Sequence, residues 1–485
     1  MPDGFVHPEE KLSWRFPKAF WIANTCELFE RAAFYGMFIA LAMYLTEKVG
    51  FTDVETGYVS ACFASIIYLL PTFMGAMADK IGFKAALTIA FSLLTVGYFL
   101  LGAAPEAGRF VSSPLAVKGT AVLSLATIMF GGAIIKPVIS GTVAKCSDDQ
   151  HRARAFSIFY QVVNIGAFTG KTVAYPLRDS PRFGLEYINY YAALMAFCAL
   201  ITTVLFYKNV DTKGTAKTAR EAWDGLVKVV LHFRFMALIL IVAGFWTIQG
   251  QLYATVPKYY LRLLGEGKPE WLANINPFVV VICVVPVTHL IRRFRPENAI
   301  GIGLFIIPLT ALCIAASPLL ESATGRSVNL LGLSLHPITV MVMIGIGMQG
   351  LAECFLSPKF LEYASKQAPE GEIGLYLGYQ HLTTFFAWAF GFAASGHLLD
   401  RFCPRPETLP LDVQQERLDA LATGTALPEA YAHAHYIWIF FAGVGIAAFL
   451  GLLLFKFVTT WIDRKRTWQE GVRAAGFGDD THKGR

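Results

Sequence analysis

Long apolar runs recur along the whole chain, and they constrain its fold more than any other feature. About twelve runs, counting the one at about 19–45, are long enough to cross a bilayer as helices. The others lie near 56–77, 84–104, 119–144, 155–176, 187–207, 235–257, 272–291, 299–317, 335–356, 374–398 and 435–460. Lipid offers no hydrogen-bond partner to free backbone groups, and these runs are too long and uniformly apolar for barrel strands. Only 16% of residues are charged, against about 25% in soluble proteins. The sequence therefore predicts an all-α polytopic membrane protein.

The distribution of basic residues predicts the orientation in the membrane. The first 18 residues are polar and include Glu9, Lys11 and Arg15, so we expect no cleavable signal peptide and an N-terminus that stays inside. Alternating the loops from there puts most basic loop residues on the same side: Lys80, Lys84, Lys145, Arg152, Arg154, Arg292, Arg293, Arg295, Arg464, Lys465 and Arg466. This bias predicts a plasma (cytoplasmic) membrane protein with both termini in the cytoplasm. It also explains the net charge of +6, so the expected neighbour is the lipid bilayer and not nucleic acid.

The spacing of the runs predicts two halves. The charged inner loop at 208–234 divides the spans equally, into an N-terminal six-helix bundle at 1–207 and a C-terminal one at 235–463, with a cytoplasmic tail at 464–485. Such a division is typical of transporters whose halves rock about a central site. The proline-rich outer loop at 400–432 reads as irregular cover with one short helix near 411–421.

The first run contains two carboxylates and a guanidinium. An ionised side chain at the centre of a membrane helix costs roughly 2.5 to 3.5 kcal/mol on insertion scales, so such residues face protein or water and mark ion or substrate paths. Glu27, Glu30, Arg31 and Phe34 follow i, i+3, i+4, i+7 and share one helix face. Glu27 stands four residues before Arg31, the favourable order for a charge pair. The sequence predicts a self-paired charged stripe that points away from lipid.

Further polar groups lie inside the later runs. Lys136 comes directly before Pro137, a face of Tyr160, Asn164 and Lys171 follows, and Glu353 stands before the Ser-Pro step at Pro358. The seventh and eighth runs carry neutral polar groups: Trp246, Gln249, Gln251, Tyr253 and Asn276. Carboxylates and amines from both halves suit a central zwitterion or anion site with proton coupling. Each group could instead form a structural ion pair or hydrogen bond, and Lys171 or Lys359 could extend to an interface.

Two sets of motifs resemble known families. Gly75-Ala-Met-Ala-Asp79-Lys80-Ile-Gly82-Phe-Lys84, between the second and third runs, resembles the signature of the major facilitator superfamily. Glu27, Glu30 and Arg31 followed by Phe34-Tyr35-Gly36 are similar to the first-span motif of the proton-dependent oligopeptide transporters, the peptide and nitrate branch of that superfamily. Matches to the same branch follow in order: Lys136-Pro137 with Ser140, Phe159-Tyr160 with Asn164 and Gly166, Phe245-Trp246 with Gln251, Asn276-Pro277, and Glu353 with Ser357-Pro358.

The resemblance implies the major facilitator fold and proton-driven uptake of di- or tripeptides, or of a related small amino or carboxylate compound, by alternating access. It gives proton coupling to Glu27, Glu30 and Arg31. The substrate-binding residues it implies are Arg31, Tyr35, Lys136, Tyr160, Asn164, Trp246, Gln251, Asn276 and Glu353. Arg31 and Lys136 would face a substrate carboxylate, while Glu353, Asn164 and Asn276 would hold an amino terminus. Gating is expected at Gly75, Asp79, Lys80, Pro137 and Pro358. We expect a monomer, no enzymatic activity, and no cofactor or metal beyond the proton gradient.

The first and seventh runs depart from that family's pattern. Ala32, Phe34 and Phe38 stand where the family usually has an aromatic residue, a tyrosine and an arginine that grips the peptide carboxylate, and Gly250 stands at an often acidic position. The space between the sixth and seventh runs also cannot hold the two extra helices common in bacterial members. These departures keep an alternative open, in which the chain is a carrier or exporter of a non-peptide anion or drug-like metabolite.

Overall fold

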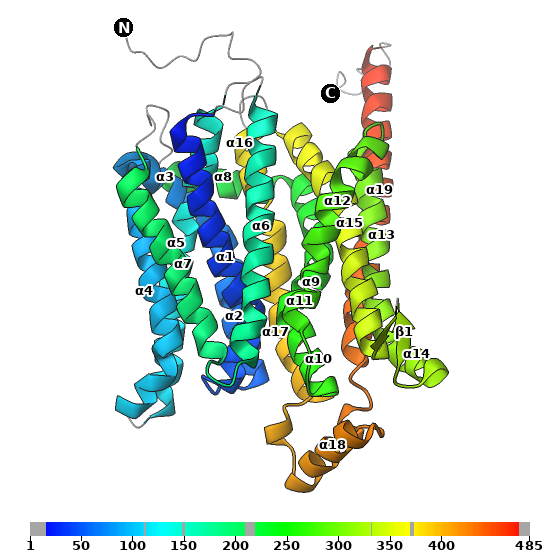
Figure 1. Ribbon diagram of the computed structural model, residues 1–485. Coiled ribbons are helices and arrows are strands. Elements are labelled where there is room, and N and C mark those ends of the chain that lie inside the picture. The colour runs from blue at the N-terminus through cyan, green and yellow to red at the C-terminus, as the bar shows by residue number, and fades with distance from the viewer. Residues whose placement is uncertain are drawn as a thin grey trace, which may run out of the picture. The chain divides into compact units, whose positions relative to one another are not determined.

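The protein is built almost entirely of α-helices, as the apolar runs predict (Figure 1). The computed structural model describes residues 16–110, 113–147, 151–208, 219–330, 332–368 and 373–474. Within these ranges a short antiparallel hairpin joins β1 (Val328–Leu330) to β2 (Leu333–Leu335), with Asn329 opposite Ser334. The all-α prediction is confirmed.

Ten helical segments in the described part are long and apolar enough to cross a membrane. Two further segments bring the number to the predicted twelve. Helices α2 (Asp53–Leu69) and α3 (Pro71–Ile81) follow one another directly and are each too short alone, and α6 (Arg152–Asp179) has the length but carries many polar residues. The polar residues that make α6 a candidate for function are therefore the ones that lower its hydropathy.

The helices form two compact units. Unit 1 comprises Met1–Asp224, Gly250–Val281 and Trp388–Ala434. Besides α2, α3 and α6, it contains α1 (Lys18–Glu47), α4 (Phe83–Phe110), α5 (Pro114–Lys145), α7 (Leu185–Phe206), α10 (Val256–Leu264), α11 (Pro269–Leu272), η1 (Pro406–Thr408), α18 (Leu411–Thr423) and η2 (Glu429–Tyr431).

Unit 2 comprises Gly225–Gln249, Ile282–Ala387 and His435–Arg485. It contains the β-hairpin and α13 (Pro296–Ala315), α14 (Ser317–Thr324), α15 (Pro337–Gln367), α16 (Ile373–Tyr379) and α19 (Tyr436–Ala474). Four helices run from one unit into the other: α8 (Ala219–Leu231), α9 (Phe233–Ala254), α12 (Ile275–Leu290) and α17 (Leu382–Phe402). In unit 2, α13 packs against both α15 and α19.

Helix α1 lies inside unit 1, where it packs against α5, α6 and α7. Its most apolar stretch is 83% buried, more than any other candidate span, so charged side chains on this helix face protein. Glycines allow α6 to approach closely. A Cβ atom at Gly166 would lie 2.6 Å from the Cβ atom of Arg31, and one at Gly36 would lie 3.1 Å from the carbonyl oxygen of Gly170. The sequence thus sets the α1–α6 spacing at the position of the charged stripe.

The loops agree with the sequence where the structure describes them. The short helix expected near 411–421 is α18, which extends over Leu411–Thr423 at the lower end of unit 1 in Figure 1. Residues 209–218 of the predicted linker lie outside the described part, and α8 follows them. The domain boundaries predicted from the spacing of the runs remain predictions.

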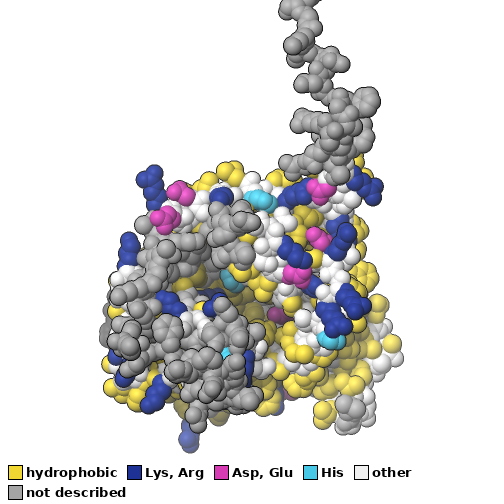
Figure 2. All heavy atoms as spheres, turned by 90° about the horizontal axis from the view of Figure 1, so that it is seen from above, with side chains coloured by type: hydrophobic (Ala, Val, Ile, Leu, Met, Phe, Trp, Pro, Cys, Tyr) yellow, Lys and Arg dark blue, Asp and Glu magenta, His cyan; other side chains and the backbone are white. Residues whose placement is uncertain are grey.

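The basic residues of the predicted cytoplasmic loops are mostly exposed. Lys80 and Arg152 in unit 1 and Arg292 and Arg293 in unit 2 all project into solvent. Figure 2 shows Lys and Arg side chains on the face of the molecule seen from above. Among the other expected gating residues, Pro137 lies within α5 and Pro358 within α15. Gly75 and Asp79 belong to α3, but their side chains lie outside the described part of the structure.

Candidate substrate and proton site

The predicted charged stripe on α1 is present and buried. Glu27 is 3% exposed, Glu30 1% and Arg31 6%. Arg31 donates to Glu30 Oε2 through Nε and pairs with the same oxygen through Nη2. Its Nε atom also lies 3.2 Å from Glu27 Oε1. The second Glu27 oxygen, Oε2, has no hydrogen-bond partner among the described residues. Arg31 thus holds Glu30 closely and Glu27 loosely.

Lys136 on α5 belongs to the same electrostatic cluster. It interacts through its charge with Arg31, Glu30 and Glu27. Its Nζ atom lies 3.8 Å from the centre of the Tyr68 ring on α2, a cation–π contact. Ser140 Oγ donates to the Lys136 carbonyl at 2.7 Å, one turn further along. The structure therefore brings together two carboxylates and two cations from α1 and α5.

Two aromatic faces complete this cluster within unit 1. The Arg31 guanidinium lies 5.5 Å from the Phe34 ring centre and 5.8 Å from that of Tyr35. Lys171 Nζ on α6 also lies 5.8 Å from the Tyr35 ring centre and donates to the Ala273 carbonyl at 3.1 Å. Lys171 is only 2% exposed, so its ammonium is held inside the protein and does not extend to an interface.

Among the described contacts, the remaining predicted site residues of unit 1 make hydrogen bonds outside the charged cluster. Tyr160 is exposed, and Asn164 Nδ2 donates to the Tyr160 carbonyl of its own helix at 2.8 Å. Gln251 is fully buried, donates to the Gly391 carbonyl at 3.3 Å and accepts from Thr255 Oγ1 at 2.6 Å. Asn276 Nδ2 is buried with no hydrogen-bond partner among the described residues. Gln251 therefore joins α9 to α17, while Asn276 keeps a free donor.

Glu353 and Trp246 belong to unit 2. Glu353 Oε2 accepts a hydrogen bond from Gln249 Nε2 at 2.7 Å, and Trp246 packs edge-on against Phe245. Lys359, also on α15, donates to the Phe294 carbonyl at 3.1 Å and pairs with Glu362 at 2.8 Å. Lys359 thus connects α15 to the loop before α13, which is a structural role.

Aromatic rings surround Phe38, one of the residues that depart from the family pattern. Phe38 is 2% exposed and stacks on Trp388 with ring centres 5.4 Å apart. Tyr253 lies 4.8 Å from it and Phe392 5.9 Å. A Cβ atom at Gly250 would lie 2.9 Å from Trp388 Nε1, so the indole occupies the space that a side chain at position 250 would need. Ring packing thus occupies the surroundings of positions 38 and 250.

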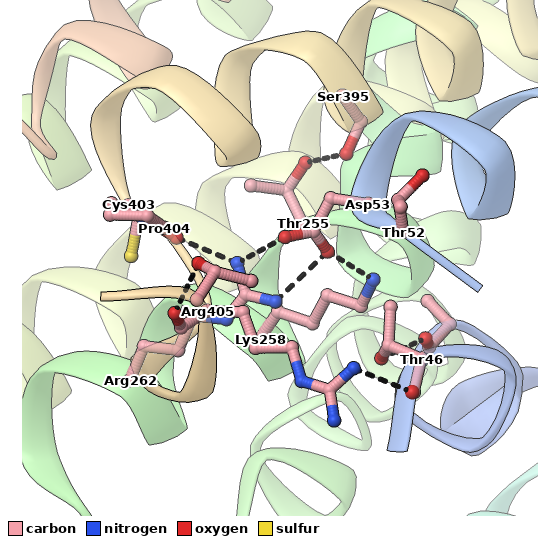
Figure 3. A network of polar contacts seen from close by, with 12 residues as sticks. Thr46, Thr52, Asp53, Thr255, Lys258, Arg262, Ser395, Cys403, Pro404 and Arg405 are labelled. Atoms are coloured by element: carbon pink, nitrogen blue, oxygen red, sulfur yellow. Dashed lines mark hydrogen bonds and ion pairs between the residues drawn. The ribbon is translucent and has the colours of Figure 1, made fainter. Parts of the chain in front are cut away.

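A second buried charge cluster lies at the start of α2, which we call the Asp53 network (Figure 3). It consists of Asp53, Lys258 and Arg262, which are 4%, 4% and 7% exposed. Lys258 Nζ lies 2.7 Å from Asp53 Oδ1, and Arg262 approaches both carboxylate oxygens, at 2.9 and 2.8 Å. The fork of Arg262 thus binds the carboxylate bidentately, which is the strongest geometry for such a pair.

The segment after α17 holds the Asp53 network in place. Arg262 Nη1 donates to the Cys403 carbonyl at 2.6 Å, and Arg417 of α18 donates in turn to the Arg262 carbonyl at 2.7 and 3.0 Å. Arg405 donates to the Thr46 carbonyl at the end of α1 at 3.0 Å. Arg405 and Arg417 satisfy carbonyl groups at the ends of α1 and α10 that the helices leave unpaired.

Sequence reasoning did not find the Asp53 network. Lys258 and Arg262 stand one turn apart just after an apolar run, and Asp53 stands just before another, which is a signal of charge at one membrane face. The pairing itself could not be predicted, because Asp53 and Lys258 are 205 positions apart. The contact of Lys136 with Tyr68 and that of Glu353 with Gln249 could not be predicted for the same reason.

Comparisons with known proteins agree with this fold. The Major Facilitator Superfamily profile matches residues 23–328. Dipeptide and tripeptide permease B of Aliivibrio fischeri (strain MJ11) is 27% identical over 82% of the chain and 88% of its own length. Dipeptide and tripeptide permease A of Proteus mirabilis (strain HI4320) is 28% identical over 77% of the chain and 84% of its own length.

Solved structures show the same architecture. One from a study of substrate recognition in proton dependent oligopeptide transporters has a TM-score of 0.66 at 16% identity, and it covers 93% of this chain and 100% of that chain. A POT family transporter in complex with 5-aminolevulinic acid has a TM-score of 0.65 at 17% identity, covering 90% and 96%. The chain belongs to the major facilitator superfamily, and the relatives that it matches are named dipeptide and tripeptide permeases.

Proposed function

We propose that the protein is a proton-coupled symporter that imports di- or tripeptides, or a related small amino or carboxylate compound, by alternating access. In this proposal it works as a monomer in the cytoplasmic membrane with both termini inside. The peptide permeases among its relatives and the motifs quoted above support the assignment.

The buried cluster on α1 and α5 is the observation that carries the proposal. Glu27 and Glu30 carry two negative charges when ionised, and Arg31 and Lys136 carry two positive ones. The cluster is therefore neutral when both carboxylates are ionised, and protonation of either leaves a surplus positive charge in a medium of low dielectric constant. A substrate carboxylate restores neutrality. Proton and substrate thus favour the same loaded state.

Within this cluster, Glu27 is the proposed proton carrier. Glu30 accepts from both Nε and Nη2 of Arg31, whereas Glu27 has one contact of 3.2 Å and an unpartnered Oε2. A protonated carboxyl group is a hydrogen-bond donor and no longer attracts a cation electrostatically. Protonation therefore costs less interaction energy at Glu27, whose contact with Arg31 is the weaker one. Arg31 and Lys136 would then receive the substrate carboxylate, and Tyr35 would line their site. We propose that Glu353 and Asn276, with Asn164, bind the amino group.

The Asp53 network would act as the outer gate in this orientation. It joins the start of α2 to α10 and α17 inside unit 1. Taking a buried carboxylate away from two cations is costly unless water replaces them. Opening of this end would therefore require water to enter at Asp53. Lys80 on α3 and the prolines Pro137 and Pro358 are the proposed movable points at the inner side.

An uptake screen tests the proposed function. The purified protein in proteoliposomes should accumulate a dipeptide or tripeptide when the outside is acidic, and a protonophore should abolish the accumulation. Dipeptides, single amino acids and small carboxylates compared at equal concentration would define the class. Uptake that equilibrates without accumulation under every pH gradient would contradict symport.

Carriage or export of a non-peptide anion is the second candidate, and the surroundings of Phe38 favour it. Phe38 and Gly250 offer no charge, and Trp388 fills the space between them. In the proposed site a peptide carboxylate would bind Arg31 and Lys136 without a further cation from position 38. Competition and melting assays test this candidate. It is supported if apolar carboxylates compete for uptake and stabilise the purified protein while dipeptides do neither.

A further inference from the structure

A small cavity lies beside the Asp53 network, where α1, α2, α10 and α17 meet. Its polar lining is formed by Asp53, Thr56, Ser60, Lys258 and Ser395. The cavity leaves about 10 Å³ for the centre of a water-sized sphere, which is close to the space that one water molecule needs. It is too small for a peptide, so it is not part of the substrate site.

Two hydroxyl groups in this lining have no partner. Thr56 and Ser60 stand one turn apart on α2 and are 2% and 5% exposed. Neither Thr56 Oγ1 nor Ser60 Oγ has a hydrogen-bond partner among the described residues. Other hydroxyls on buried helix faces bond to the carbonyl four residues earlier, as Ser65 does to Ala61 on the same helix. Buried polar groups without a partner are rare in native proteins and point to a bound molecule.

Lys258 brings an ammonium group to the same cavity. An ammonium group has three donors, and the described contacts of Lys258 supply one acceptor, Asp53 Oδ1 at 2.7 Å. Asp53 is already shared with Arg262. The cavity therefore combines unused donors from Lys258 with two hydroxyls that can each donate or accept.

We propose that this cavity binds one water molecule, which accepts a hydrogen bond from Lys258 and bonds to the hydroxyls of Thr56 and Ser60. Three protein partners are the usual number for an internal water. A metal cation is disfavoured because the ammonium group lines the cavity. A chloride ion would suit the ammonium and hydroxyl donors, but the Asp53 carboxylate in the same lining repels it.

The water has a consequence for the outer gate, which rests on the proposed function. The Lys258–Asp53 pair is nearly dry, so separating the two charges would leave each without a partner. A water already bound to Lys258 keeps the ammonium solvated as the pair separates. The site would thus lower the barrier to opening without adding a charge.

The sign of a stability change tests the proposal. Thr56→Val keeps the shape of the side chain and removes the hydroxyl. If water is bound, the variant removes one of its partners, and we expect the melting temperature of the purified protein to fall by about 1 to 3 °C. In a dry cavity the same change removes an unsatisfied buried group, so a rise or no change would overturn the proposal. Ser60→Ala should lower the melting temperature likewise, beyond the effect of the control Ser65→Ala.

A second measurement separates water from an anion. Melting curves in sodium chloride and in sodium gluconate of equal ionic strength should coincide for the wild type. Chloride-dependent stabilisation that Ser60→Ala abolishes would overturn the water assignment. Both measurements use the protein without a substrate or a pH gradient, so they stand or fall independently of the transport assay.

Discussion

Arg31 grips Glu30 with two nitrogens but touches Glu27 with only one, at 3.2 Å. This asymmetry predicts different structural consequences for two matched substitutions. Glu30→Gln removes the principal counter-charge of a buried guanidinium, which costs on the order of 3 kcal/mol. Glu27→Gln removes one contact and leaves Arg31 paired with Glu30, so it should cost less than Glu30→Gln.

Thermal melting of the two purified variants checks this difference. We expect Glu30→Gln to melt several degrees below the wild type and Glu27→Gln to melt at a temperature between the two. The reverse order would show that Glu27 is the main partner of Arg31, and the proposed assignment of the proton to Glu27 would fail with it.

The close approach of α1 and α6 predicts the effect of a single methyl group. In Gly166→Ala the new Cβ atom would lie 2.6 Å from the Arg31 Cβ atom and 2.8 Å from the Leu28 carbonyl oxygen. The helices must part, at a cost of about 1 to 3 kcal/mol, and Arg31 must shift. We expect a lower melting temperature together with lost proton-driven uptake.

Gly443→Ala is the matched control for this change. Gly443 also lies within a helix, α19, and a Cβ atom there would meet nothing within 4 Å. Alanine has the better helix propensity, so this variant should melt at or slightly above the wild type and transport normally. If both variants lost the same melting temperature and uptake, close packing at Gly166 would not explain the effect of Gly166→Ala.

Lys258 predicts a rise in stability at alkaline pH. Burial is the largest effect on its ammonium group and, with repulsion from Arg262, outweighs attraction to Asp53 and Glu47, so the Lys258 pKa falls to about 8. The unfolded chain then binds more protons than the folded one between about pH 8 and the ordinary lysine value of about 10.4. Stability contributed by Lys258 should therefore rise with pH across this window, by at most about 1.4 kcal/mol per unit, and stay flat below it.

Lys258→Arg isolates this contribution, because a guanidinium stays charged throughout the window. The measurement is the melting temperature of both proteins from pH 7 to 10. The wild type should gain on the variant above pH 8. A constant difference over the whole range would mean that Lys258 remains protonated in the folded protein.

Local patterns in the sequence predicted the helical fold and the part of the candidate site that lies on α1. Apolar runs predicted the helices because backbone N–H and C=O groups in lipid must form hydrogen bonds within the segment. Glu27, Glu30 and Arg31 could be related to each other because the helix period places them on one face. The two segments that do not count as apolar spans are α6, which carries its own polar face, and α2–α3, which break at Pro71. Both interruptions fall in helices to which we assign proposed site or gating residues.

Contacts between distant segments could not be predicted in the same way. Lys258 meets Asp53, and Arg417 meets the Arg262 carbonyl, only after several helices have packed. The sequence showed charges near the membrane faces without showing their partners. Gln251 is a second example. Its place in the family pattern predicted a substrate-binding role, and the sequence did not show that its side chain bonds to Gly391 and Thr255.

The most direct test of the coupling mechanism is transport by Glu27→Gln in proteoliposomes, measured in two modes. Both modes use the substrate that the uptake screen identifies. Exchange of labelled for unlabelled substrate needs binding and gating alone. Accumulation under a pH gradient that is acidic outside also needs proton binding. We expect the variant to retain exchange and lose accumulation. Normal accumulation would contradict the role of Glu27 as the proton carrier.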